Sequence, residues 1–142
     1  MKASLRRWNV DVVKRWGPEL AEAMRVEAPL GKVTPTSRPP GTLRKSIKAG
    51  RTSQTGTSAT VQVLAPVIQA RTTDKGARAH RIPRSGSARL RFFWANGPQG
   101  AGIYHFRHVN HPGNAPQNWW QPGLKRRAST TLRRAARRTP FR

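Results

Sequence analysis

Positive charge is distributed very unevenly along this chain, and that distribution limits what the chain can fold into. Only six of the 28 basic residues precede Ala28, whereas four of the 5 acidic residues do. From Ala28 to the C-terminus, 22 lysines and arginines accompany a single acid, Asp74. Such a surface repels itself unless a polyanion, counterions or an acidic protein lies beside it. Because only 35% of the residues are hydrophobic, we expect a small core and a chain that associates with a partner.

Several protein classes are excluded by what the sequence lacks. The chain has no cysteine, which rules out a disulfide framework, a thiolate metal site and a cysteine nucleophile. Its first residues, MKASLRRWNVDVVKRW, contain no apolar run of the kind found in a secretory signal. No segment approaches the roughly 20 apolar residues that a membrane-spanning helix needs. We therefore expect a protein made in the cytoplasm of its host, or kept in a particle assembled there, without membrane contact.

The N-terminal segment is predicted to be a helix. Apolar residues fall at three- and four-residue spacing over residues 4–28, which places them on one stripe. Gly17-Pro18 lies within this segment, and a proline removes a helical hydrogen bond, so we expect a kink there or two successive helices. Ala28-Pro29 ends the element. The stripe consists of Leu5, Trp8, Val12, Trp16, Leu20 and Met24.

A second helix is predicted from about residue 118 to residue 138. One stripe of this helix is apolar, because small and large apolar residues recur every four positions, whereas the other faces carry arginine. Pro122 falls in the first turn, where a helix tolerates proline. Before the helix, His111-Pro112-Gly113 is predicted to form a tight turn that leaves a strand, with Gly113 free to adopt a positive φ. The apolar stripe consists of Trp120, Leu124, Ala128, Leu132 and Ala136.

The residues between the two helices are predicted to be mostly strands and turns. Residues 29–42 hold four prolines and two glycines, so they form a long loop. The polar segment 50–58 is expected to be a turn, residues 66–79 a loop with room for one helical turn, and residues 95–102 a hairpin tip. Strands are expected at Leu43 to Ala49, Ser58 to Ala65, Arg89 to Trp94 and Ile103 to Val109.

This order of elements predicts one α+β domain that spans residues 1–142. It has an N-terminal helix kinked at Gly17-Pro18, an antiparallel sheet of about four strands and a basic C-terminal helix packed on the sheet. Leu90, Phe92 and Trp94 alternate along one strand, so they are expected to share a face of the sheet.

Four segments carry short motifs in a fixed order. They are Ala28-Pro29 with Gly41-Thr42-Leu43-Arg44-Lys45-Ser46-Ile47, then Ala79-His80-Arg81-Ile82-Pro83-Arg84 with Leu90-Arg91-Phe92, then Val109-Asn110-His111-Pro112-Gly113, and finally Gln117 to Leu124. They resemble the AP…TG-x-L-x-x-S-I, PH-x-I-x-P…LRF, V-x-HPG and QPFL-x-x-AL motifs of the neck or tail-completion proteins of long-tailed bacteriophages. The resemblance covers most of residues 20–137. Three features depart from it: Leu64 to Thr72 lacks a glutamate and a glycine of the family's YA-x-x-VE-x-GT motif, the loop at 30–40 is longer, and Trp119-Trp120 replaces Pro-Phe.

The resemblance implies a structural virion protein that joins the DNA-filled head to the tail. Its location is then the neck, at the head-to-tail junction, and its first partners are copies of itself in a ring of six or twelve. Its other partners are the adjacent head-closure or connector proteins, the tail-terminator or tail-tube proteins, and double-stranded DNA in the channel. In such a ring the loop at 30–40 and the hairpin tip at 95–102 are expected to reach neighbouring rings.

Two sets of residues are expected to make these contacts. Contacts to neighbouring subunits or rings are expected at Trp119, Trp120, Leu124, Pro112 and Gly113, since tryptophans commonly anchor interfaces. Contacts to DNA or to an acidic protein surface are expected from the basic residues of the last helix and of the segment after the long loop. These are Arg44, Lys45, Lys48, Lys125, Arg126, Arg127, Arg133, Arg134, Arg137 and Arg138.

An enzymatic function is not predicted, and no cofactor, metal site or catalytic residue is expected. His105, His108 and His111 recur at a spacing of three, but in an extended strand neighbouring members of this set point to opposite faces. No carboxylate lies near them to complete a metal site of the nuclease type. An HNH-like nuclease that uses His108, Asn110 and His111 remains an alternative, and metal-dependent cleavage that is lost in His111→Ala would support it. The chain also contains no glycine-rich phosphate-binding motif.

The main alternative to the virion protein is a basic nucleic-acid-binding protein of the ribosomal or nucleoid type. Its support is the sequence isoelectric point of about 12.0 together with the arginine-rich C-terminal segment. Tight nucleic-acid binding with a steep salt dependence, in a protein that forms no ring and joins no phage particle, would favour this alternative.

Overall fold

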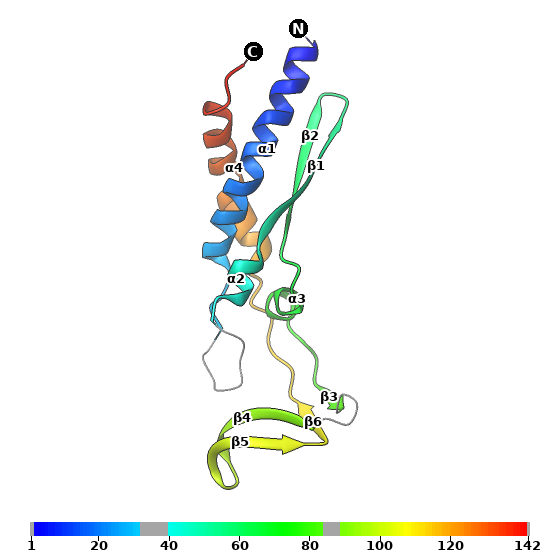
Figure 1. Cartoon of the computed structure of the whole chain (residues 1–142), viewed down its shortest axis with the longest axis vertical. Helices are drawn as coiled ribbons and strands as arrows, with labels where there is room; N and C mark the ends of the chain where they lie inside the picture. The colour runs from blue at the N-terminus through cyan, green and yellow to red at the C-terminus, as the bar shows by residue number, and fades with distance from the viewer. Residues whose placement is uncertain (1, 32–39, 84–88, 142) are drawn as a thin grey trace.

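The computed structural model describes residues 2–31, 40–83 and 89–141. Two antiparallel helices and a β-hairpin form an elongated body, and the remaining strands extend from one end of it (Figure 1). The elements are α1 Lys2–Glu27, α2 Thr42–Ser46, β1 Lys48–Thr55, β2 Ser58–Leu64, α3 Ile68–Lys75, β3 His80–Pro83, β4 Leu90–Gly97, β5 Gly100–Phe106, β6 His108–His111 and α4 Trp120–Arg137. The predicted α+β class is confirmed, with a long helix at each end of the sequence and antiparallel strands between them.

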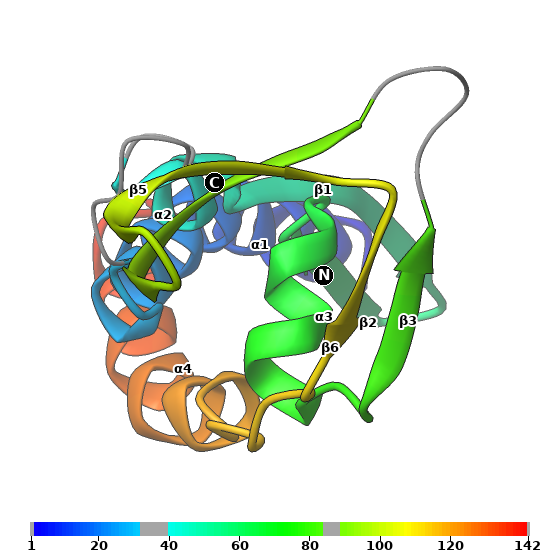
Figure 2. The same ribbon diagram turned by 90° about the horizontal axis from the view of Figure 1, so that it is seen from below.

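The strands are divided among three two-stranded antiparallel sheets rather than joined in one meander of about four. β1 pairs with β2, β3 pairs with β6, and β4 pairs with β5. Helix α3 follows β2 and precedes β3 in the chain, and it lies between the first hairpin and the later strands along the long axis of the molecule (Figure 1; Figure 2 gives the view along that axis). β6 returns to pair with β3, so the β4–β5 hairpin is an excursion between these two strands.

Helix α1 runs through Pro18 as one element, so the expected division into two helices does not occur. Pro18 is exposed, whereas Gly17 is buried against the β1–β2 hairpin. A Cβ atom at Gly17 would lie only 2.7 Å from Cγ2 of Val61. Glycine therefore lets β2 approach the helix closely, and this packing supports the helix where proline weakens it.

The core lies where the end of α1 meets α2 and the start of α4. Met24 and Ile47 are completely buried in it. Because Leu43 and Ile47 are four residues apart and both are buried, the segment between them forms α2, not the predicted strand. The first strand accordingly begins later and continues to Thr55, through most of the segment expected to be a turn. The other buried members of the core are Leu20, Ala21, Ala28, Leu43 and Trp119.

Three further expectations were wrong in detail. Residues 68–75 form a helix of 8 residues, α3, where a loop with room for one helical turn was expected, because Ala70 and Asp74 lie four apart and both face the core. Strand β3 was not expected at all. In α4 the deepest positions are Gly123, Thr131 and Ala135, one residue away from the predicted apolar stripe, and Leu132 of that stripe is exposed.

Candidate functional site

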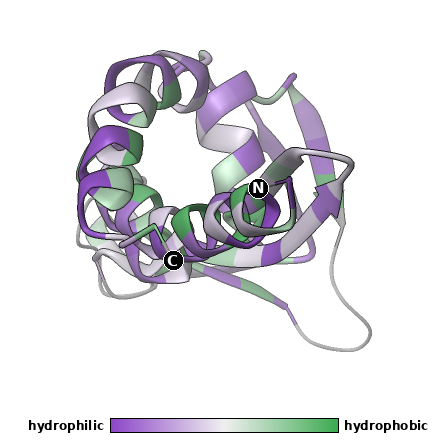
Figure 3. Ribbon diagram, turned by 90° about the horizontal axis from the view of Figure 1, so that it is seen from above, coloured by the Kyte–Doolittle hydropathy of each residue, from purple (hydrophilic) through white to green (hydrophobic). Residues whose placement is uncertain are grey.

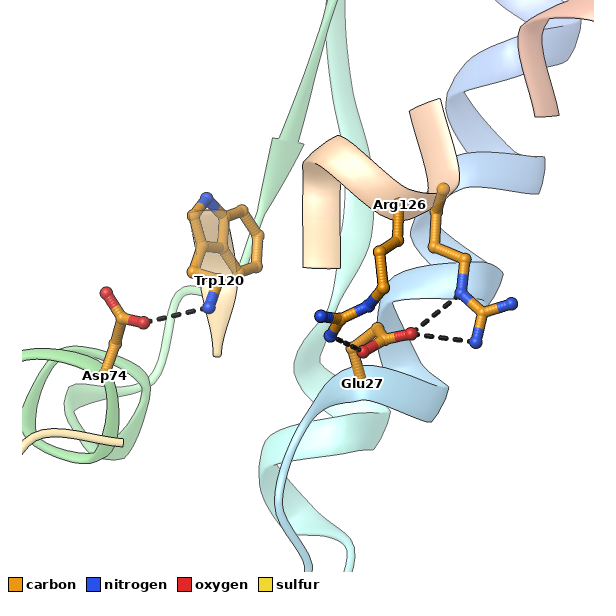
Figure 4. Close-up of polar contacts among 5 residues, drawn as sticks. Glu27, Asp74, Trp120 and Arg126 are labelled. Carbon is orange, nitrogen blue, oxygen red and sulfur yellow. Dashed lines mark hydrogen bonds and ion pairs between the residues drawn. The ribbon is translucent and has the colours of Figure 1, made fainter. Parts of the chain in front are cut away.

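The basic helix α4 is joined to α1 by ion pairs that engage some of its arginines (Figure 4). Arg126 and Arg127 both donate hydrogen bonds to the carboxylate of Glu27, the latter from Nε at 2.8 Å. The hydrogen bonds from Arg126 and then from Arg127 hold the pKa of Glu27 below its usual value, although burial acts in the opposite direction. At the other end of the seam, Nη1 of Arg138 lies 3.6 Å from Oε1 of Glu19.

The predicted cationic contact residues therefore fall into two groups. Arg126, Arg127 and Arg138 are paired with carboxylates of α1. Nε of Arg44 donates to the carbonyl of Ala28 at 2.7 Å, just beyond the end of α1, where a cation is favourable for the helix dipole. The remaining members are exposed and free to meet a partner: Lys45, Lys48, Lys125, Arg133, Arg134 and Arg137.

Asp74 has a structural role that sequence reasoning missed. Its Oδ1 accepts the backbone N–H of Trp120, the first residue of α4, at 2.9 Å, and its Oδ2 lies 3.1 Å from Nζ of Lys75 (Figure 4). Trp119, at the N-cap position, supplies no side-chain hydrogen bond to the helix. Asp74 thus caps α4 from a different helix. Asp74 is the single acid after Glu27 in the sequence, and this isolation is the signal that could have indicated its capping role.

The paired tryptophans have different surroundings. Trp119 is only 7% exposed within the core, and its Nε1 donates to Oγ1 of Thr73 at 3.3 Å. Trp120 packs edge-on against it, with ring centroids 5.2 Å apart, and is half-buried together with Leu124. Trp119 therefore anchors α4 to its own chain, whereas Trp120 and Leu124 keep part of their surface exposed.

The predicted turn at Pro112-Gly113 is also present. Gly113 has φ 84°, as expected for a residue that turns the chain out of strand β6. A Cβ atom there would lie 2.3 Å from the carbonyl oxygen of Ala77, so only glycine fits against this backbone. Pro112 is exposed and Gly113 is not, so Pro112 alone presents its side chain to the surroundings.

Strands β3 to β6 form a projecting structure, here called the arm, at the end of the molecule away from the termini (Figure 1). β4 and β5 pack chiefly on each other. As predicted, Leu90, Phe92 and Trp94 lie on one face, since their partners in β5 are Phe106, Tyr104 and Gly102. The rings of Phe92 and Phe106 stack at 5.3 Å, and those of Trp94 and Tyr104 meet edge-on at 5.6 Å. Trp94 is 41% exposed, so the face is open at its outer end.

The arm is basic as well as aromatic. Arg91 and Arg107 are exposed on it, and the sequence contains no acid after Asp74. The tip of the hairpin is narrower than predicted, with Gly97 and Gly100 flanking two residues. The hydroxyl of Tyr104 donates to the carbonyl of Gly100 at 2.8 Å and accepts the backbone N–H of Gln99, which fixes the tip.

The histidines of the arm are distributed over different strands. His105 pairs with Arg91 across β4–β5, whereas His108 and His111 belong to β6. His111 stacks on His80 at 5.2 Å, and its Nδ1 accepts the backbone N–H of Gly113. Over residues 2–31, 40–83 and 89–141, no group of three or more histidine, cysteine or acidic residues is placed to hold a metal ion.

The expected contact loop at 30–40 lies mostly outside the described residues. Among the helices described, none combines the length and the apolar character needed to cross a membrane. Comparison of the chain with protein-family models, with curated proteins and with solved structures finds no match to any of them.

Proposed function

We propose that this protein is a structural subunit of the neck of a long-tailed bacteriophage. In this role it forms a ring of identical copies that joins the DNA-filled head to the tail, and DNA passes through the ring. The four sequence motifs that resemble the neck proteins suggest the class. The observation that supports it best is the β4–β5 hairpin of the arm, which is aromatic and basic and whose aromatic face is open at Trp94.

The physical chemistry of the arm favours a subunit of an assembly over an isolated protein. A two-stranded hairpin is marginally stable in water at best, because one pair of strands buries little apolar surface. Complete burial of a large apolar side chain contributes about 1.5 to 3 kcal/mol. Cover over Trp94, which is 41% exposed at the outer end of the aromatic face, would therefore stabilise the arm and the interface together.

Assembly into a ring also accounts for the position of the aromatic surface on the arm, which projects from the rest of the molecule. In a cyclic ring each subunit contacts the next through two different surfaces, so a patch on one copy fits a different patch on its neighbour. The arm of one subunit would supply the first surface. Trp120, Leu124 and Pro112 remain partly or fully accessible for contacts with neighbouring subunits or with the adjacent neck proteins.

The proposal is tested by changing the arm and measuring assembly. Trp94→Ser should shift the purified protein from rings to monomers in mass photometry and electron microscopy, because it removes the exposed end of the aromatic face. The matched control is Val26→Ser, which changes a 64% exposed apolar residue on α1 and should leave the rings intact. Both variants should keep the circular dichroism spectrum of the unmodified protein.

Two results would contradict the proposal. The first is an unmodified protein that stays monomeric at all concentrations and joins no phage particle. The second is a phage whose gene deletion still yields infectious particles, since loss of a neck subunit should leave filled heads and finished tails that do not unite.

A further inference from the structure

The end of the molecule that carries both termini has a basic surface not used by the contacts described so far. The start of α1, the end of α4 and the β1–β2 turn lie together there, and hydrophilic residues alternate with hydrophobic ones along the helices (Figures 1 and 3). Nε1 of Trp8 donates to the carbonyl of Thr139 at 3.0 Å, and Nδ2 of Asn9 donates to the carbonyl of Thr57 at 2.8 Å. These bonds hold the three segments in fixed positions.

A groove of about 660 Å³ runs between the first half of α1 and the segment after α4. We call it the terminal groove, and its walls are formed by Arg7, Trp8, Asp11, Lys14, Arg15 and the pair Thr139-Pro140. On the other side of Arg7, Asp11 and Lys14 a second hollow of about 540 Å³ reaches Gln54 and Gly56 of the first hairpin. Arg7 and Lys14 of α1 therefore lie between the two hollows and line both of them.

These cations differ from those of the α1–α4 seam because no ion pair joins them to a carboxylate within the described residues. Arg7, Lys14 and Arg15 are exposed, and within the described ranges none of them takes part in an ion pair. They lie at positions i, i+7 and i+8, so they face the same side of the helix. Arg7 and Arg15 are about 12 Å apart along the axis, since each helical residue advances about 1.5 Å. The row can therefore contact more than one phosphate.

We propose that the terminal groove binds the phosphate backbone of duplex DNA, an inference that rests on the proposed place of the protein around the DNA channel. The arginines and the lysine suit phosphate oxygens as hydrogen-bond donors. Binding at this site is accordingly independent of sequence.

Asp11 lowers the affinity of the terminal groove for the phosphates of DNA. It lies one helical turn from both Arg7 and Arg15, and its negative charge opposes a phosphate in the same space. Its presence suits a channel wall along which DNA has to slide. Asp11→Asn should therefore tighten DNA binding about two- to fivefold, as the loss of one nearby like charge implies.

The test is fluorescence anisotropy of a labelled duplex with the full chain over a range of NaCl concentrations. The triple variant Arg7→Gln, Lys14→Gln, Arg15→Gln should bind at least tenfold more weakly, and the slope of log K against log salt should fall by about 2 to 3, near 0.9 per lost phosphate contact. The matched control is Arg51→Gln, Arg71→Gln, Arg78→Gln, which removes the same charge from exposed positions of β1, of α3 and of the segment after α3. This control should lose less than about threefold.

Three outcomes would overturn the inference. Equal losses in the two triple variants would show that binding is diffuse. Tighter binding of polyglutamate than of duplex DNA would identify an acidic protein as the partner, and a strong preference for single-stranded DNA would point to the aromatic arm. Ring formation by the Arg7, Lys14, Arg15 variant is measured in parallel, so that loss of DNA binding with intact rings removes this inference and leaves the neck proposal standing.

Discussion

Glu27 connects the two long helices through a single carboxylate. Its side chain is only 11% exposed, and both of its oxygens accept from guanidinium groups of α4. A surface ion pair contributes little, but a carboxylate with two arginines in a partly covered seam is held in one geometry. The sequence shows Arg126 and Arg127 as part of a basic run, and only the antiparallel packing of α1 and α4 shows that their counterion is Glu27.

The lowered pKa of Glu27 gives a pH dependence with a definite sign. The folded protein releases the Glu27 proton more readily than the unfolded chain, whose ordinary pKa is 4.5, so this carboxylate stabilises the fold above about pH 4.5 and ceases to do so as the pH falls through the lower folded value. Glu27→Gln should lower the melting temperature at neutral pH, and the difference from the unmodified protein should shrink below about pH 4.5.

Thermal melts by circular dichroism at a series of pH values measure this effect. Glu22→Gln is the control, because Glu22 pairs only with Arg25 and its side chain is 69% exposed. It should change the melting temperature little at any pH. A constant difference between Glu27→Gln and the unmodified protein down to strongly acidic pH would contradict the assignment.

At the scale of elements, the attachment of α4 depends on α3. Backbone N–H groups of Gln117 and Asn118 donate to the carbonyls of Thr73 and Asp74, and the Asp74 carboxylate receives the N–H of Trp120. The short helix α3 therefore holds the segment that leads into α4. It does so with hydrogen bonds, whereas the seam with α1 combines ion pairs with the hydrogen bond from Trp16 to Thr131.

Asp74→Ala should destabilise the protein by about 1 to 2 kcal/mol, because it leaves the first N–H of α4 without its acceptor. Asp74→Asn keeps an oxygen in the same place and should lose clearly less. Urea unfolding followed by tryptophan fluorescence gives both values, since Trp119 and Trp120 adjoin the cap. Equal losses in the two variants would indicate that the charge of Asp74 matters and that the cap does not.

The sequence predicted the elements whose apolar spacing is regular and missed those whose buried face is small or polar. The stripe of α1, the hairpin with Phe92 and Trp94, and the positive φ of Gly113 were all predicted from local rules. The helix α3 was missed because its buried side consists of Ala70 and Asp74. Periodicity recognises apolar side chains, so it overlooks a carboxylate that is buried to cap another helix.

The candidate site was predicted less well, because the order of charged residues in the sequence does not show which of them form ion pairs in the folded protein. Thr131 of α4 is buried since its hydroxyl accepts Nε1 of Trp16 at 2.9 Å, and this contact sets the rotation of α4. That rotation turns Arg127 and Arg138 toward α1. The unpaired cations of Arg7, Lys14 and Arg15 were not singled out, since acids lie nearby in the sequence.

At the scale of the whole molecule, the formal net charge of +23 on 142 residues opposes a compact fold through repulsion between like charges. Within the described residues, the four carboxylates that form ion pairs lie in α1 or α3, and none lies in the arm. Salt that screens the repulsion between the cations should therefore stabilise the isolated protein. Its melting temperature is expected to rise with NaCl, and to rise at a much lower ionic strength when duplex DNA is added.

Differential scanning fluorimetry along a NaCl series, with sucrose as an uncharged control, measures this response. A melting temperature that is independent of salt would show that repulsion between cations is not a significant cost in the folded state. It would also contradict the expectation that the basic surface needs an anionic partner beside it.

The two ends of the chain meet at the terminal groove, at the opposite pole from the arm (Figure 1). A purification tag fused to either end consequently stands beside Arg7 and Trp8 and far from Trp94. Tagged material is thus well suited to ring reconstitution and poorly suited to DNA titrations, especially when the tag is rich in histidine or acidic residues. The tag should therefore be removed by protease before DNA binding is measured.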